Sequence, residues 1–115
     1  MDERLEKALE FGNFRQTLAN QKKNIKERFN IQRKIHYNGG SFVADEKTIT
    51  FVATLKNLDI SSTILIDTKE TPIEIKNIEE FLEILLNSYK DSTFEYKTNI
   101  DKINKMRNIK KIMDW

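Results

Sequence analysis

The chain has 115 residues, of which 38% are apolar and 33% charged, and its net charge is +2. This length provides one domain, since domains cluster near about 100–150 residues, so two catalytic domains and a large enclosed active site are excluded. The absence of cysteine excludes disulfides, thiolate zinc sites and cysteine nucleophiles. Because the apolar share is below the usual ~45–50%, we expect a thin core and elongated helical packing.

The first predicted element is a long helix over about residues 3–32. Its apolar residues recur at spacings of three, four and seven, which is a helical period. Gly12 is its one weak point and costs roughly 1 kcal/mol relative to Ala. The residues of this stripe are Leu5, Ala8, Phe11, Phe14, Leu18, Ile25 and Phe29.

A small β-containing head is expected over residues 33–76. Asn38–Gly39–Gly40 is the best turn signal in the chain, and it predicts a hairpin of residues 33–37 and 41–44. A second hairpin is expected from residues 62–67 and 73–75. Pro72 fits the first residue of a strand or an edge strand.

Residues 45–58 leave two interpretations open. Thr48, Thr50 and Thr54 favour a strand by propensity. Asp45 suits the cap of a short helix, and a helix packed over two hairpins gives the better topology. The two interpretations are supported about equally, and we favour the helix slightly.

The last predicted element is a helix over about residues 77–111. Asn77 is a suitable N-cap, with Glu79 and Glu80 near the positive helix end. No glycine or proline interrupts this segment, so we expect one helix rather than two that break near Ser92. Residues 112–115 then form an apolar tail. The apolar stripe consists of Ile78, Phe81, Leu82, Leu85, Leu86 and Tyr89.

These elements predict a single α+β domain over residues 1–115, in which two long antiparallel helices form a coiled-coil-like hairpin that flanks a small β-hairpin head. Charge is sorted along the chain: residues 1–36 and 97–115 each carry +4, and residues 37–96 carry −6. The antiparallel arrangement would place the acidic start beside the basic end. It would also place basic residues 22–33 beside the acidic residues Glu79, Glu80 and Glu83.

The search for catalytic groups finds no constellation. His36, the single histidine, lies between Ile35 and Tyr37, and a structural or solvent-facing role is favoured over that of a general base or ligand. The Asn38–Gly39–Gly40–Ser41 stretch lacks the lysine of a P-loop. The sequence therefore predicts no enzyme, no cofactor, no metal site and no small-molecule substrate.

Three surfaces are candidates for binding a partner. The tail residues Ile112, Met113 and Trp115 either fold back onto Phe11 or Leu5, or form a docking peptide anchored by tryptophan. Unpaired hairpin edges of the head are the second candidate. The third is a set of basic residues that could neutralise phosphates, namely Lys22, Lys23, Lys26, Lys105, Lys110 and Lys111.

The acidic start is followed by no apolar segment, so we expect no secretory signal. No run reaches the ~18 apolar residues that would cross a membrane. We therefore expect an intracellular protein without a membrane partner.

Several short stretches resemble known proteins. Residues 11–22 (FGNFRQTLANQK), 64–67 (ILID), 71–75 (TPIEI) and 105–109 (KMRNI), with Phe42 after the Asn-Gly-Gly turn, resemble small proteins of marine T-even-like myoviruses, the contractile-tailed phages of cyanobacteria. The order of helix, hairpins and helix is similar to a prefoldin-type subunit. The first resemblance implies a phage protein in the cytoplasm of an infected bacterium, or one built into the virion. It carries over no functional residues.

The leading hypothesis is a non-enzymatic phage interaction protein, structural or assembly-related. It would act by contacts with another phage or host protein and with a second copy of itself. The alternative is a nucleic-acid-binding or transcription-associated phage regulator that uses the basic helix ends.

Overall fold

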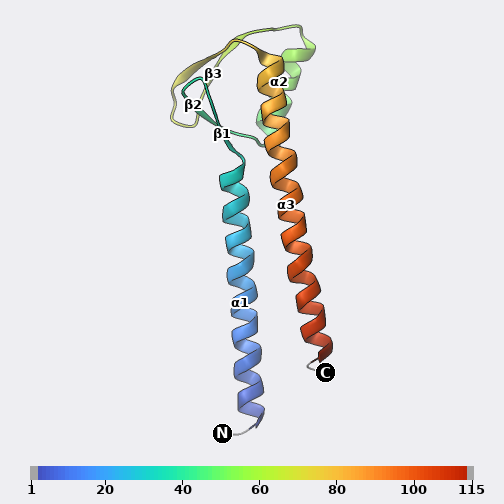
Figure 1. Cartoon of the computed structure of the whole chain (residues 1–115). Coiled ribbons are helices and arrows are strands. Elements are labelled where there is room, and N and C mark those ends of the chain that lie inside the picture. Colours follow the sequence, from blue (N-terminus) through green and yellow to red (C-terminus); the bar gives the residue numbers. More distant parts are fainter. Residues whose placement is uncertain (1–2, 114–115) are drawn as a thin grey trace. The chain divides into compact units, whose positions relative to one another are not determined.

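The computed structural model describes the backbone of residues 3–113 and the side chains of residues 3–108. Within this range the chain forms three helices and two small antiparallel sheets, which confirms the predicted α+β class (Figure 1). The elements in chain order are α1 (Glu3–Gln32), β1 (Lys34–Tyr37), β2 (Gly40–Val43), α2 (Glu46–Asn57), β3 (Thr63–Ile66), β4 (Pro72–Ile75) and α3 (Ile78–Met113).

The chain divides into two compact units. The helical unit contains α1 up to Arg28 and α3 from Glu95 onward. The head unit contains Phe29–Phe94, and therefore the end of α1, both hairpins, α2 and the first half of α3. Among the described residues, no helix combines the length and the apolar character that crossing a bilayer requires.

In the helical unit, α1 and α3 run side by side in opposite directions, as a helical hairpin does (Figure 1). Leu18 of α1 and Ile103 of α3 are buried, and Arg28 forms an ion pair with Glu95 at 2.9 Å. The predicted apolar stripe of α1 is only partly buried. Phe11 remains 53% exposed and Leu5 52% exposed.

The predicted charge pairing of Glu79 with the basic end of α1 is wrong. Glu79 instead forms an ion pair with Lys56 of α2, at 3.7 Å. The end of α1 meets α3 further along, where the Ser88 hydroxyl donates to the Gln32 carbonyl at 3.0 Å. The reason is that the first turns of α3 pack into the core of the head, where Glu79 faces Lys56 of α2.

Both predicted hairpins are present. Asn38 and Gly39 have φ angles of 48° and 83°, as a two-residue type I′ turn requires, and Tyr37 pairs with Gly40 across it. In the second hairpin, Ile66 pairs with Pro72, the first residue of β4. This is one of the positions that the sequence predicted for the proline.

The ambiguous segment 45–58 is the helix α2. The Asp45 carboxylate accepts a hydrogen bond from the Thr48 N–H at 2.8 Å and thereby caps the helix, as predicted. Asn77 caps α3 in the same way, because its side-chain oxygen accepts from the Glu80 N–H at 3.1 Å. The local sequence therefore predicts where both helices begin.

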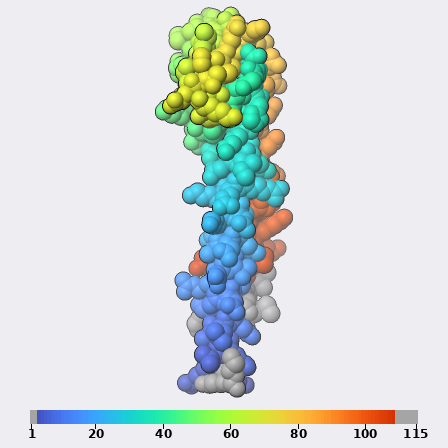
Figure 2. All heavy atoms as spheres, turned by 90° about the vertical axis from the view of Figure 1, so that its left-hand side faces the viewer, coloured from blue at the N-terminus to red at the C-terminus, as the bar shows by residue number. Residues whose placement is uncertain are grey.

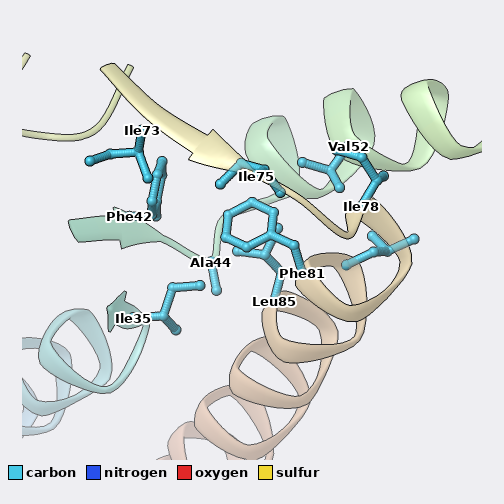
Figure 3. Packing of buried hydrophobic residues seen from close by; sticks show 10 residues of the cluster. Ile35, Phe42, Ala44, Val52, Ile73, Ile75, Ile78, Phe81 and Leu85 are labelled. Carbon is cyan, nitrogen blue, oxygen red and sulfur yellow. The ribbon is translucent and has the colours of Figure 1, made fainter. Parts of the chain in front are cut away.

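The core of the head unit is centred on Phe81 (Figure 3). The Phe81 ring packs edge-on against Tyr37 and Phe42, with ring centroids 5.1 Å apart in both pairs. α3 thus supplies the centre of a core whose walls come from both hairpins and α2. The buried residues are Ile35, Phe42, Ala44, Val52, Ile73, Ile75, Ile78, Phe81, Leu82 and Leu85.

Gly40 allows the second hairpin to approach the first. A Cβ atom at this position would lie 2.5 Å from Cγ1 of Ile73 and 3.0 Å from the Phe42 ring. Ile73 is buried in the core and its side chain cannot retreat without opening a void. The second glycine of the Asn-Gly-Gly signal therefore serves packing, while the first serves the turn.

Exchanging two glycines for alanine should change stability in opposite directions. Gly40→Ala should lower the free energy of unfolding by about 1–3 kcal/mol, because the methyl group overpacks against Ile73. Gly12→Ala, in an exposed part of α1 with no atom within 4 Å, should raise it by about 0.5–1 kcal/mol. Urea unfolding followed by circular dichroism measures both, and a shift in the same direction for both variants would contradict this packing.

Candidate functional site

The Asp67 carboxylate joins the two hairpins. One oxygen accepts from the N–H groups of Lys69 and Thr71, at 2.9 and 2.8 Å, and so builds the turn between β3 and β4. The other accepts from the Ser41 N–H of β2 at 3.0 Å, and the Ser41 carbonyl accepts from the Thr68 N–H at 2.9 Å. The side chain is buried although it is charged, because every bond it makes favours the ionised form.

These bonds lower the pKa of Asp67 below the ordinary value of 3.8. The N–H groups of Ser41 and Thr71 are the largest causes, and partial burial opposes them. A group that is ionised more readily in the folded chain stabilises that chain above its unfolded pKa. This contribution is lost as the pH falls through the folded pKa, so Asp67 has the properties of a structural carboxylate.

A second polar cluster lies where the end of α1, α2 and α3 meet in the head. The Arg33 guanidinium lies over the Phe29 ring at 4.1 Å and donates to Asn30. Burial acts to raise the pKa of Asp45, but bonds from Thr48 and the charge of Arg33 outweigh it, so the pKa lies below 3.8.

Tyr89 extends this cluster to α3. Its hydroxyl donates to Glu46 at 2.9 Å. This bond and the charge of Glu46 raise the pKa of Tyr89 above its ordinary value. The cluster thus ties three helices together within the head.

The residue types with catalytic potential do not converge. His36 is exposed on β1. Among the described residues, no group of three or more His, Asp or Glu side chains is placed to hold a metal ion.

The predicted basic residues are exposed where their side chains are described. Lys22, Lys23 and Lys26 lie on α1 and Lys105 on α3, and none of them forms an ion pair with another residue of the range 3–108. The side chains of Lys110 and Lys111 lie outside the described residues. Arg28, on the same stretch of α1, does form an ion pair, with Glu95.

The predicted tail cannot be placed. Ile112 and Met113 belong to the backbone of α3, but their side chains, and the whole of Trp115, lie outside the described residues. Their role as a docking peptide stays a prediction.

Exposed apolar side chains are the main feature that the sequence interpretation missed. Leu5 and Leu9 on α1 and Met106 on α3 are about half exposed. Ile64 and Ile66 on β3 are 66% and 64% exposed, and the segment that contains β3 and the turn after it (yellow) lies at the surface in Figure 2. The signal for β3 was the run Ile64–Leu65–Ile66, which is apolar on both faces of a hairpin that has only one buried face.

Comparison with protein families, curated proteins and solved structures finds no match for this chain. The resemblances to myovirus proteins and to prefoldin-type subunits therefore stay predictions. Function has to be argued from the surfaces described above.

The pH dependence of stability should show how much the Asp67 carboxylate contributes to the stability of the fold. The urea midpoint should fall as the pH is lowered through and below 3.8, because protonation removes an acceptor from the Ser41 and Thr71 N–H groups. Asp67→Asn should lower the midpoint at neutral pH and show a smaller further fall in acid. Glu70→Gln, at an exposed carboxyl of the same turn, is the control and should behave as the parent chain. An unchanged acid dependence in Asp67→Asn would refute the assignment.

Proposed function

We propose that this chain is a non-enzymatic interaction protein that acts through protein–protein contacts along its long helices. The observation that carries the proposal is how few apolar side chains the helical unit buries and how many it leaves exposed. Among its described residues only Leu18 and Ile103 are buried apolar side chains, whereas Leu5, Leu9 and Met106 remain about half exposed.

Leu5 and Leu9 lie one helical turn apart and therefore on one face of α1. At 100° per residue, this face is turned away from the one that Leu18 uses to pack. A fully buried side chain of this size contributes about 1.5–3 kcal/mol, so covering these two leucines gives a partner a useful apolar anchor. A helix of this kind docks by its apolar face in a groove or against another helix.

The phage part of the proposal comes from the sequence resemblance alone. It extends the proposal to a structural or assembly-related protein of a contractile-tailed phage, working in the infected bacterial cytoplasm with the virion as the other location. A coiled-coil-like pairing of α1 and α3 belongs to the same proposal.

The test is affinity capture with the whole chain as bait, from extracts of infected cells, with and without nuclease. One protein should be retained in stoichiometric amount after nuclease treatment. Leu5→Ser with Leu9→Ser should weaken its binding at least about tenfold, which corresponds to about 1.4 kcal/mol. Gln16→Ser with Asn20→Ser is the matched control, since these exposed residues have the same spacing on the same face of α1. Equal retention by both double variants would refute the apolar anchor.

A nucleic-acid-binding role is the second candidate, favoured by the three exposed α1 lysines without ion pairs to described residues. Lysines that contact phosphates release counterions, so binding weakens as salt rises, with a log–log slope of about −0.9 per contact on duplex DNA. Replacing Lys22, Lys23 and Lys26 by Gln should make the slope shallower by about 2–3 units. Fluorescence anisotropy with a labelled duplex measures it, and absent binding at low salt would remove this candidate.

A further inference from the structure

The two hairpins of the head have four outer edges, and two of these are partly occupied by other groups of the chain. On β2, both the N–H and the carbonyl of Ser41 are bonded, to the Asp67 carboxylate and to the Thr68 N–H. On β4, the Glu74 carbonyl accepts from the Asn38 side-chain amide at 3.0 Å, and Pro72 has no N–H to offer. Each of these strands therefore offers only part of its outer backbone to another chain.

The two open edges differ in chemistry. β1 presents exposed Lys34 and His36, and a lysine on an edge strand is a common protection against unwanted pairing. β3 presents Ile64 and Ile66, and it carries no charge, proline, glycine or bulge. The uncharged stretch extends from Ile60 through Ile66. β3 thus lacks the charge, the proline and the bulge that commonly keep an edge strand from pairing.

The backbone of β3 faces outward at these same two residues. The Asp67 N–H donates to the Thr71 carbonyl at 2.9 Å, in the register that pairs Leu65 with Ile73. Hydrogen-bonded and non-hydrogen-bonded pairs alternate in an antiparallel ladder, so the N–H and C=O groups of Ile64 and Ile66 point away from β4. No hydrogen bond within the described chain uses them.

We propose that β3 pairs with β3 of a second copy of this chain, antiparallel about a two-fold axis, with Ile64 opposite Ile66 of the other copy. This register joins the free N–H and C=O groups of both isoleucines without drawing on residues outside β3. Leu65 then lies opposite Leu65 of the second copy in a non-hydrogen-bonded pair. All isoleucines of both edges share one face, because residues opposite each other point to the same side of a sheet.

Two properties of the head favour a second copy over a different partner. The stretch from Ile60 to Ile66 is uncharged, so the two-fold arrangement brings no like charges face to face. Pairing also converts two marginal hairpins into one sheet of order β4–β3–β3–β4, and sheets of three or more strands are the independently stable ones. The outer β4 edges of this sheet are interrupted by Asn38 and Pro72, which favours an assembly of two copies over growth into a fibre.

This inference is independent of the helical contact proposed above, because it uses a different surface. Sedimentation of the whole chain over a range of concentrations should show a monomer–dimer equilibrium. Ile64→Lys should weaken the dimer at least about tenfold, because it places a charge at the joined edge. Ile64→Thr, which keeps a strand-forming residue, should weaken it less.

Matched controls distinguish a loss of pairing along β3 from other effects of a substitution on the dimer. Glu74→Lys adds the same side chain to the same face on β4, opposite Ile64 and away from the joined edge, and should leave the dimer unchanged. Leu5→Ser with Leu9→Ser should also leave it unchanged. A chain that stays monomeric throughout, or that dimerises as tightly with Ile64→Lys, overturns the proposal, and so does a monomer that instead binds a different protein along β3.

The register has its own test, because the chain contains no cysteine. Leu65→Cys should form an inter-chain disulfide readily, since facing residues of a non-hydrogen-bonded pair lie within the ~4.4–6.8 Å that a disulfide spans between Cα atoms. Ile64→Cys is the control and should cross-link slowly, because the two identical residues are then diagonal and roughly 7–8 Å apart. Faster cross-linking of Ile64→Cys would overturn the register.

Discussion

The bonds that Asp67 accepts from both hairpins are the constraint on which the head depends. They hold the turn between β3 and β4 against the edge of β2, and Gly40 lets Ile73 settle into the core at the same place. Because the charge is buried, each N–H donor must stay in position, and the two small sheets are kept in one fixed relation. The same bonds occupy part of the β2 edge, whereas β3 is an apolar edge without a partner among the described residues.

The distribution of apolar residues explains why this chain keeps apolar surfaces exposed. Phe81 and its neighbours on α3 pack with apolar side chains of both hairpins and α2 in one core. The helical unit buries little, since among its described residues only Leu18 and Ile103 are buried apolar side chains. A helix pair held by so few apolar contacts has much to gain from an additional partner.

The local signals in the sequence predicted most of the elements. The Asn-Gly turn, the caps at Asp45 and Asn77 and the apolar stripe of α3 each act within a few residues, so they can be recognised without knowing the fold. Segment 45–58 was ambiguous because its threonines favour a strand, and the cap at Asp45 together with packing of Val52 decided for α2. Tertiary context overrides β propensity in such short segments.

Features that depend on contacts between residues far apart in the sequence could not be predicted in this way. The steric role of Gly40 requires knowing that Ile73 lies above it, and the pairing of Glu79 with Lys56 requires the register of α3 in the head. The exposure of Ile64 and Ile66 has the same origin, because a strand that is apolar on both faces does not reveal which face the core covers. The residues of the proposed β3 interface thus combine an ordinary local sequence with an unusual tertiary setting, which is why this edge can be recognised only when the chemistry of the other three edges is known.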